Sequence, residues 1–233
     1  MKNIALILAS GTGERSGLSV PKQFYEIDDK TFLEIVVSTF DGHSGIDEII
    51  VVTNKEYLER TQNLLRNFSK VKKIISGGVT RQESSYKGIM ALGDEECNVL
   101  IHDAARVFVS EKIISACIES LQEHDAVCTV VNSTDTMFEV DSNGKIVNVP
   151  QRATLRCAQT PQCFRLSLIK KAHKKALEKG LSVTDDCGLV TDSKLAEIYT
   201  VSGDTDNKKI TYSEDFELAK IIYKKRLDLK RSS

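Results

Sequence analysis

The sequence lacks three features that would place it in a class at once: a charge bias, a long apolar run and paired cysteines. Its 233 residues carry 32 Lys and Arg against 33 Asp and Glu, so nothing predicts a nucleic-acid or membrane-surface partner. No apolar run approaches the roughly 20 residues of a membrane span. Met1, Lys2 and Asn3 lead directly into an apolar strand pattern, where a signal peptide would place a cleavable segment. We therefore expect a cytoplasmic protein.

The cysteines are also not spaced for a metal site. No two form a C-x-x-C pair, and no His lies at zinc-ligand spacing. In a cytoplasmic protein such residues are usually reduced and buried as small hydrophobes. We expect this here, rather than zinc or disulfides, for Cys97, Cys117, Cys128, Cys157, Cys163 and Cys187. The length fits one α/β domain, 1–233, around a single core.

The opening segment, Ile4 to Gln23, has the pattern of an anion-binding loop. Ile4–Leu8 is a short, continuous apolar run, which favours a central strand of a parallel sheet. Small residues come directly after it, and small residues at a strand end let backbone N–H groups turn toward an anion. The residues predicted to form this phosphate cradle are Ser10, Gly11, Thr12 and Gly13.

Two familiar phosphate loops do not match this segment. A dinucleotide fingerprint needs a third glycine where this chain has Ser16, and a P-loop needs Gly-Lys-Ser/Thr closing a longer glycine frame. Here the glycines are succeeded by Arg15 and then Lys22. Two cations beside an anion-binding loop can neutralise a polyphosphate and its transition state. The alternative is a glycine turn with solvated charges.

Alternation of apolar strands and amphipathic helices continues along the chain. It predicts a doubly wound, mostly parallel α/β sheet with a ligand crevice outside the carboxyl ends of the strands. The expected strands are 4–8, 48–53, 71–75, 98–101, 125–131 and 197–201, and the expected helices are 32–40, 56–68, 81–92, 110–123, 166–177 and 213–227. The loops 10–22, 77–84 and 102–106 should therefore meet at one crevice.

The second of these loops offers glycine backbone for close approach, and Arg81 and Ser84 as donors. Another interpretation is a helix start in which Thr80 and Glu83 form a capping box. Both can hold.

The third loop, His102 to Arg106, comes after a buried strand and contains a carboxylate. Asp103 is the candidate for a magnesium ion carried by a triphosphate, because Mg²⁺ prefers carboxylate oxygens and substrate phosphates. The alternative is a structural ion pair between Asp103 and Arg106. We expect His102 to be oriented by packing rather than to act as a general base.

From Met137 the alternation is interrupted. Asp141-Ser-Asn-Gly144 between apolar residues is a strong hairpin signal. Arg152 comes next as a candidate anchor for a phosphate group, because a guanidinium fork fits phosphate geometry. We interpret Gln159-Thr-Pro-Gln162 as a rigid polar turn.

These motifs resemble a known family. The first loop is similar to the sugar-phosphate nucleotidyltransferase motif A-G-x-G-x-R-M followed by P-K, with Ser10 and Ser16 as departures. Together with the string His102 to Arg106, it resembles the cytidylyltransferases of 2-C-methyl-D-erythritol 4-phosphate and ribitol 5-phosphate, although Val107 replaces their usual Pro. The resemblance runs from Ile4 to about Leu227 and implies a Rossmann-like, glycosyltransferase-A-like nucleotidyltransferase fold.

The resemblance also implies roles for individual residues. In that family the glycine-rich second loop holds the cytosine base and ribose, which nominates Gly78, Val79, Arg81 and Ser84. Arg15, Lys22 and Lys209 are implied to be catalytic, Lys209 through a D/N-x-K-x-T signature that ends here at Thr211. The implied substrate-side residues are Asp103, Arg106, Arg152, Thr184, Asp185 and Lys209.

The hairpin, about 137–155, is implied to be an arm that embraces a second subunit of a homodimer. The alternative is a surface hairpin on a monomer.

The implied reaction is transfer of CMP from CTP to a small polyol phosphate, with Mg²⁺ as the cofactor. Three places favour the ribitol branch: Val149-Pro150-x-Arg152, Arg156, and Thr184 to Val190. The string His102 to Arg106 and Ala158 before Gln159 favour the isoprenoid branch. Ribitol 5-phosphate or a related alditol phosphate feeding surface-polymer synthesis is the expected acceptor, and methylerythritol phosphate is the alternative.

Two other classes stay open at this point. A non-catalytic CTP sensor would keep the binding loops but release no pyrophosphate. A nicotinamide-dependent oxidoreductase would need the missing glycine and an acidic ribose clamp where Thr53 and Asn54 stand.

Overall fold

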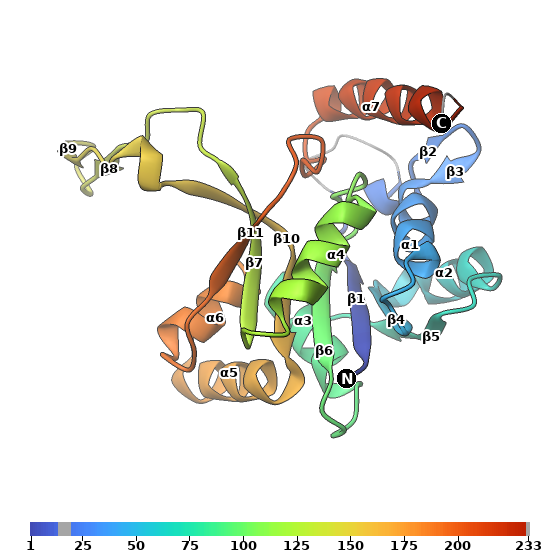
Figure 1. Cartoon of the computed structure of the whole chain (residues 1–233), viewed down its shortest axis with the longest axis horizontal. Coiled ribbons are helices and arrows are strands. Elements are labelled where there is room, and N and C mark those ends of the chain that lie inside the picture. The colour runs from blue at the N-terminus through green and yellow to red at the C-terminus, as the bar shows by residue number, and fades with distance from the viewer. Residues whose placement is uncertain (14–19, 232–233) are drawn as a thin grey trace.

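The computed structural model describes residues 1–13 and 20–231, and within them a seven-stranded sheet forms the centre of the fold (Figure 1). Its strand order is β11-β7-β10-β6-β1-β4-β5. The strands are β1 (Asn3–Ala9), β4 (Glu48–Thr53), β5 (Val71–Ser76), β6 (Asn98–Asp103), β7 (Ala126–Asn132), β10 (Arg156–Arg165) and β11 (Tyr199–Ser202). Strand β1 pairs in parallel with β4 and β6, whereas β10 runs antiparallel to both β6 and β7.

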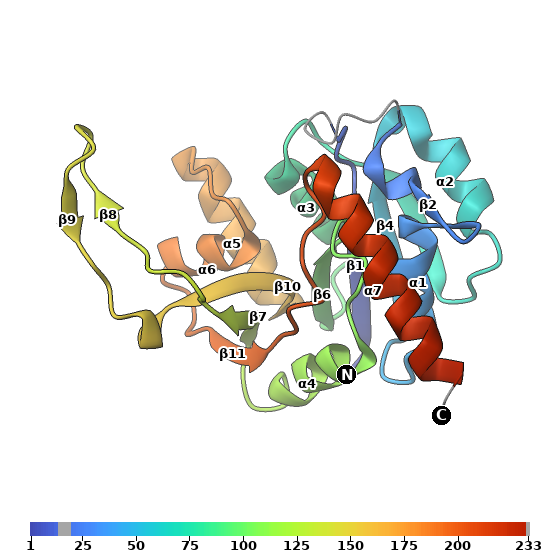
Figure 2. The same ribbon diagram turned by 90° about the horizontal axis from the view of Figure 1, so that it is seen from above.

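Helices cover both faces of the sheet (Figure 2). Successive residues of β1 point to opposite faces and therefore pack in two different apolar clusters. Ala5 and Ile7 pack in one apolar cluster with α1 (Phe32–Gly42), α2 (Leu58–Leu65) and α4 (Glu111–Ser120). Leu6 and Leu8 pack in a second cluster with α3 (Arg81–Met90), α5 (Leu166–Lys179) and α6 (Asp186–Asp192). The predicted doubly wound sheet is confirmed.

The last helix, α7 (Ser213–Arg231), closes the end of the molecule beyond the strand ends (Figure 1). Phe216 on this helix packs with Phe32, Phe108 and Ile210 in a third apolar cluster. The helix extends past Leu227, where the sequence pattern placed its end. The first loop returns through short elements, η2 (Lys22–Phe24), β2 (Glu26–Ile27) and β3 (Lys30–Thr31), while η3 (Lys55–Tyr57) precedes α2.

Local sequence explains where several helices begin. Thr80 and Glu83 form the capping box suggested for α3: the Glu83 backbone N–H donates to Thr80 Oγ1 at 3.1 Å. Asp185 caps α6, since its Oδ1 accepts a hydrogen bond from the Gly188 backbone N–H at 2.8 Å. These caps fix the helix starts beside the loops at the strand ends.

The predicted hairpin is present and projects away from the sheet (Figures 1 and 2). It consists of β8 (Glu139–Val140) and β9 (Ile146–Asn148), and the chain returns to β10 through η4 (Arg152–Thr154). Gly144 has φ +79° in the turn, a conformation that favours glycine. We call residues 137–155 the arm. Its large apolar side chains are 50 to 59 % exposed: Met137, Phe138, Val140, Ile146, Val147 and Val149.

Two sequence-based expectations were wrong. Gln159–Gln162 is not a turn but lies inside β10, where the pairing with β7 shifts register between Ala158 and Gln162. These polar side chains are buried but have hydrogen-bond partners, so the strand continues; Gln159 Nε2, for example, donates to the Asp204 carbonyl at 2.8 Å. Cys157 is exposed and Cys187 is half-buried rather than buried, while the cysteines in the described residues are free, as expected.

No helix in the part of the chain described here combines the length and apolar character needed to cross a bilayer.

Candidate active site

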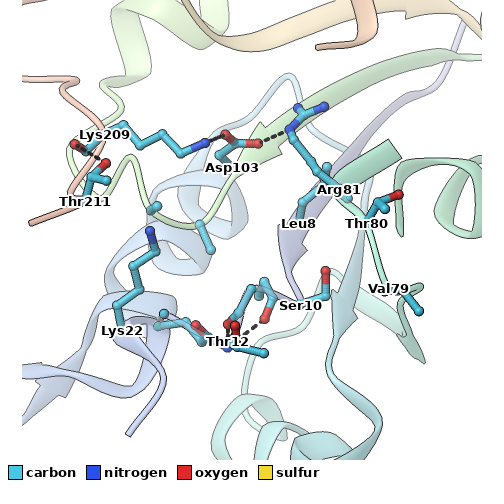
Figure 3. Close-up of a pocket in the computed structure, with 16 residues that line it drawn as sticks. Leu8, Ser10, Thr12, Lys22, Val79, Thr80, Arg81, Asp103, Lys209 and Thr211 are labelled. Carbon is cyan, nitrogen blue, oxygen red and sulfur yellow. Dashed lines mark hydrogen bonds and ion pairs between the residues drawn. The ribbon is translucent and has the colours of Figure 1, made fainter. Parts of the chain in front are cut away.

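A cavity of about 410 Å³ opens where the carboxyl ends of β1 and β6 meet (Figure 3). All three predicted loops contribute to it, together with a segment before α7. Its lining consists of Leu8, Ala9, Ser10, Gly11, Thr12, Gly13, Lys22, Gln23, Val79, Thr80, Arg81, Asp103, Ala104, Ala105, Lys209 and Thr211. The prediction that the loops meet in one crevice is confirmed.

Serine side chains join the first loop to the second. Ser10 Oγ donates to Ser84 Oγ at 2.8 Å, and Ser84 Oγ in turn accepts from the Gly78 backbone N–H at 3.1 Å. Gly77 makes this approach possible, since a Cβ there would lie 2.7 Å from both Ser10 Cβ and Ser84 Oγ. Ser84 is fully buried, so the structure places it beneath the loops, where it holds their backbone in shape.

Lys22 projects from η2 into the cavity (Figure 3). Its Nζ donates to the Ile210 carbonyl at 3.0 Å, which links the first loop to the segment before α7. The neighbouring Gln23 is buried, and its Nε2 donates to the Ala9 carbonyl at 2.8 Å. Gln23 therefore anchors the strand end from below, and this role had no sequence signal. Arg15, the other cation predicted for this loop, belongs to the segment 14–19, which lies outside the described residues.

Asp103 lies between two cations on the opposite side of the cavity (Figure 3). Its Oδ1 accepts from Arg81 Nε at 2.9 Å and its Oδ2 from Lys209 Nζ at 2.8 Å. Burial alone would raise the pKa of the Asp103 carboxyl, but the charges of Arg81 and Lys209 hold that pKa well below its ordinary value. The carboxylate is therefore ionised throughout the neutral range.

The alternative of an Asp103–Arg106 ion pair is wrong. The Arg106 guanidinium instead donates to the backbone carbonyls of Asn207 and Ala158, each at 3.0 Å. It thereby fastens the third loop to β10 and to the segment that carries Lys209. Arg106 does not line the cavity in the described structure.

His102 is fully buried and held from both ring nitrogens. Nε2 lies 3.0 Å from the Arg106 carbonyl and Nδ1 lies 3.0 Å from Thr160 Oγ1. Burial lowers the pKa of His102 to about 4, so the ring is neutral at physiological pH. The expectation that packing orients His102 is confirmed. Thr160 Oγ1 also accepts from the Asp103 backbone N–H at 3.1 Å, a positioning role that the sequence analysis missed.

The acceptor-side candidates lie apart from the cavity lining. Arg152 is exposed in η4, where its Nη1 donates to the Thr134 carbonyl at 3.3 Å. Thr184 is exposed before α6, and the Oδ2 of Asp185 accepts from Gln162 Nε2 at 2.8 Å. The chain therefore does not bring these residues together with Lys22 and Lys209 around the described cavity.

Among the hydroxyl-bearing lining residues, Thr80 and Thr211 were not nominated. Thr80 was interpreted only as a helix cap, and Thr211 was quoted only as the end of the lysine signature. Both hydroxyl-bearing residues stand one or two positions from a nominated cation, Arg81 and Lys209 respectively. That spacing was the signal that could have found them.

Comparison with known proteins gives consistent matches over nearly the whole chain. A family model, IspD, described as 2-C-methyl-D-erythritol 4-phosphate cytidylyltransferase, matches residues 3–225. The chain is 40% identical over 226 residues to the 2-C-methyl-D-erythritol 4-phosphate cytidylyltransferase of Clostridium perfringens, covering 96% of this chain and 99% of that one.

A second relative carries a different name. The chain is 38% identical over 231 residues to a bifunctional ribulose 5-phosphate reductase/CDP-ribitol pyrophosphorylase of Haemophilus influenzae. The match covers 97% of this chain and 49% of that protein, so the chain spans about half of its length. Among solved structures, a 4-diphosphocytidyl-2C-methyl-D-erythritol synthase from Anaerococcus prevotii matches with a TM-score of 0.86 at 30% identity, covering 96% of both chains.

Proposed function

The chain belongs to the IspD family of CTP-dependent cytidylyltransferases, and on that premise we propose that it transfers CMP from CTP to D-ribitol 5-phosphate or a related alditol phosphate. The products are a CDP-alditol and pyrophosphate. The observation that carries the CTP-dependent part of this proposal is the convergence of Lys22, Arg81 and Lys209 on the cavity beside the glycine loop. Cations arranged around an anion-binding loop suit a nucleoside triphosphate.

In the proposed reaction a phosphate oxygen of the acceptor attacks the α-phosphorus of CTP. A new P–O bond forms, the bond between the α-phosphorus and the bridging oxygen breaks, and pyrophosphate leaves. The nucleophile is already ionised at neutral pH, so the step needs no general base, in keeping with a neutral, buried His102. Catalysis then consists of positioning and charge stabilisation, with no covalent intermediate.

Lys22 and Lys209 are assigned to charge stabilisation. The described contacts hold both ammonium groups at the cavity, Lys22 through the Ile210 carbonyl and Lys209 through Asp103. A triphosphate would compete for these contacts: it offers Lys22 a charged acceptor in place of a carbonyl, and it offers Lys209 phosphate oxygens beside the Asp103 carboxylate. Arg15 is assigned to the same role by family resemblance, and that assignment stays a prediction.

The donor set at the cavity fits a magnesium ion that arrives with the triphosphate. Within the described residues no group of three or more His, Cys, Asp or Glu could hold a metal alone. Asp103 faces the cavity, and each of its oxygens keeps a lone pair beyond the bond to Arg81 or Lys209. Mg²⁺ bound by substrate phosphates and one carboxylate would neutralise triphosphate charge here.

The acceptor assignment is supported by residues outside the cavity lining. Arg152 in η4 and Arg156 at the start of β10 lie at the base of the arm, and Thr184 to Val190 matches the ribitol pattern. The H. influenzae relative, whose name includes CDP-ribitol pyrophosphorylase, supports the same acceptor. The second candidate is 2-C-methyl-D-erythritol 4-phosphate, favoured by the family model and the C. perfringens relative.

Pyrophosphate release from CTP tests both candidates in one assay. The purified protein is given CTP and Mg²⁺ with either ribitol 5-phosphate or 2-C-methyl-D-erythritol 4-phosphate, in parallel and at matched concentrations. We expect a higher kcat/KM with ribitol 5-phosphate. A preference for methylerythritol phosphate reverses the acceptor assignment. CTP binding without pyrophosphate release, with both of these acceptors and with related alditol phosphates, would indicate a nucleotide sensor.

The arm is proposed to embrace a second copy of the chain. Six large apolar side chains on one short hairpin lie at least half exposed, which is unusual for a hairpin that faces only water. A partner arm crossing a two-fold axis would cover such a surface by an isologous contact.

A further inference from the structure

Behind the cavity, at the first residue of α6, lies a buried carboxylate that the proposed mechanism does not use. Asp186 is fully buried. Its Oδ2 accepts from Arg81 Nη1 at 2.8 Å, and its Oδ1 accepts from Ser85 Oγ at 2.6 Å. His173 Nε2 lies 3.7 Å from the same Oδ1. Asp186 does not line the cavity, so its contact with the site runs through Arg81.

Arg81 is held at two points by carboxylates on opposite sides. Nε donates to Asp103 at the cavity, and Nη1 donates to Asp186 behind it. Lys209 binds the other oxygen of Asp103. Lys209, Asp103, Arg81 and Asp186 therefore form a series of ion pairs in which positive and negative side chains alternate. The remaining nitrogen, Nη2, is buried and has no hydrogen-bond partner within the described residues.

Two-point attachment fixes the plane of the guanidinium. A guanidinium presents its donors as a rigid fork, so two carboxylates at different edges define its orientation. Without the charge on Asp186, Arg81 can turn its fork onto Asp103, where it competes with Lys209 for the same carboxylate. Removing one partner of a buried ion pair is costly because the other charge is left uncompensated.

Asp186 also stands next to the acceptor candidates in the chain. Its backbone N–H donates to Gln162 Oε1 at 3.0 Å, and Gln162 Nε2 donates to Asp185 Oδ2 at 2.8 Å. The segment from Thr184 to Asp186 is therefore fastened to β10 on one side and to Arg81 on the other. A shift of this segment must move Arg81 or break its ion pair.

We propose that Asp186 is a positioning residue that orients Arg81 in the nucleotide cavity and couples the Thr184–Asp185 segment to it. The inference rests on the proposed function for the identity of the ligand, CTP. It assigns no contact between Asp186 and substrate. The effect of losing Asp186 must therefore pass through Arg81, which can be measured.

The test is a double-mutant cycle on the full chain, read as the dissociation constant of Mg²⁺–CTP by calorimetry. Asp186→Asn should weaken binding about tenfold, within the range of coupling between contacting residues. In an Arg81→Gln background the same substitution should have no further effect. Asp192→Asn, exposed at the other end of α6, is the matched control and should bind as the wild type does.

Additive losses in the cycle, or wild-type affinity in Asp186→Asn, would overturn the proposal. If Asp186→Asn does not fold, Ser85→Ala removes the second hydrogen bond to Asp186 and keeps all charges. It should weaken binding about threefold, near the lower end of such couplings, and only when Arg81 is present. Pyrophosphate release by the wild type is measured separately. A wild type that binds CTP but releases no pyrophosphate would refute the proposed function. The binding cycle would still decide the role of Asp186.

Discussion

The nucleotide cavity and the arm differ in whether their side chains find partners within a single chain. At the cavity, both oxygens of Asp103 accept from cations, and Arg81 is held by two carboxylates. On the arm, Phe138, Val140 and Val147 are more than half exposed. The cavity is therefore organised before any ligand or partner arrives. The arm carries surface whose burial needs something outside the chain.

This difference separates two kinds of functional residue. Arg81 is placed by buried partners on α6 and β6, so its position depends only on the fold of a single chain. Arg152 contacts a backbone carbonyl at the base of the arm, and it is exposed. Substitutions at the cavity should change chemistry without changing assembly. Substitutions of the exposed apolar side chains of the arm should instead change assembly.

The largest effect is expected at Lys22. Lys22→Ala removes a cation that the proposed mechanism assigns to the transition state, so kcat should fall about 100-fold, the scale of losing one such donor. Pyrophosphate release at saturating CTP and acceptor measures it. Lys112→Ala, exposed on α4, is the control. Wild-type turnover in Lys22→Ala would remove Lys22 from the mechanism.

Adjacent lysines provide a sharper comparison. Lys209 faces Asp103 in the cavity, whereas Lys208 pairs with Asp215 at 2.8 Å outside it. Lys209→Ala should lower kcat/KM by at least tenfold, since an aligned cation at developing charge is worth more than about 1.4 kcal/mol. Lys208→Ala should leave kcat/KM unchanged, because the Lys208 side chain is half exposed and does not line the cavity. Equal losses in both variants would contradict the assignment.

Acid sensitivity tests whether the charges behind the cavity are paired as described. Burial alone would raise the pKa of Asp186, but Arg81, His173 and Ser85 lower it from 3.8 to about 2. A lowered carboxyl pKa contributes stability that is present above the unfolded pKa and lost as pH falls through the folded one. Most of this contribution, about 2 kcal/mol, should be lost as the pH falls from about 5 to about 2.

Denaturant unfolding of the wild type and Asp186→Asn across that range measures this loss. The difference in unfolding free energy between them should shrink as the pH falls. A difference that stays constant with pH would mean that Asp186 is not held ionised by Arg81.

The smallest effect on the chain itself is expected on the arm. Phe138→Ser with Val140→Ser should change the unfolding free energy of one chain by no more than about 0.5 kcal/mol, because both side chains are exposed. It should nevertheless convert a dimer to a monomer in sedimentation. Leu177→Ser, equally exposed but on α5, should leave assembly intact. A wild type that sediments as a monomer contradicts the dimer proposal.

Sequence patterns located the fold and the cavity because both depend on local signals. Apolar runs such as Ile4–Leu8 identified strands, and parallel pairing brings the residues after each strand to one edge. The position of Asp103 in the cavity was predictable from its place at the end of β6. The capping box of α3, formed by Thr80 and Glu83, was also predictable, because its two residues lie three positions apart in the sequence.

The missed features depend on contacts between distant residues. Arg81 and Asp186 are 105 positions apart, and no local pattern joins them. Gln159–Gln162 was interpreted as a turn because it is polar and contains Pro161, whereas strand pairing and hydrogen bonds to distant groups such as the Asp204 carbonyl keep it in β10. Arg106 was paired with the nearest acid in the chain, but it binds carbonyls that only the folded chain brings close.

The central claim is that a nucleoside triphosphate occupies the cavity of about 410 Å³ beside the glycine loop. A crystal structure of the protein with CTP and Mg²⁺ tests it most directly. We expect the triphosphate against Gly11 and Gly13, with Lys22 Nζ within hydrogen-bond distance of a phosphate oxygen. CTP bound elsewhere, with Lys22 facing solvent and far from any phosphate, would contradict the account.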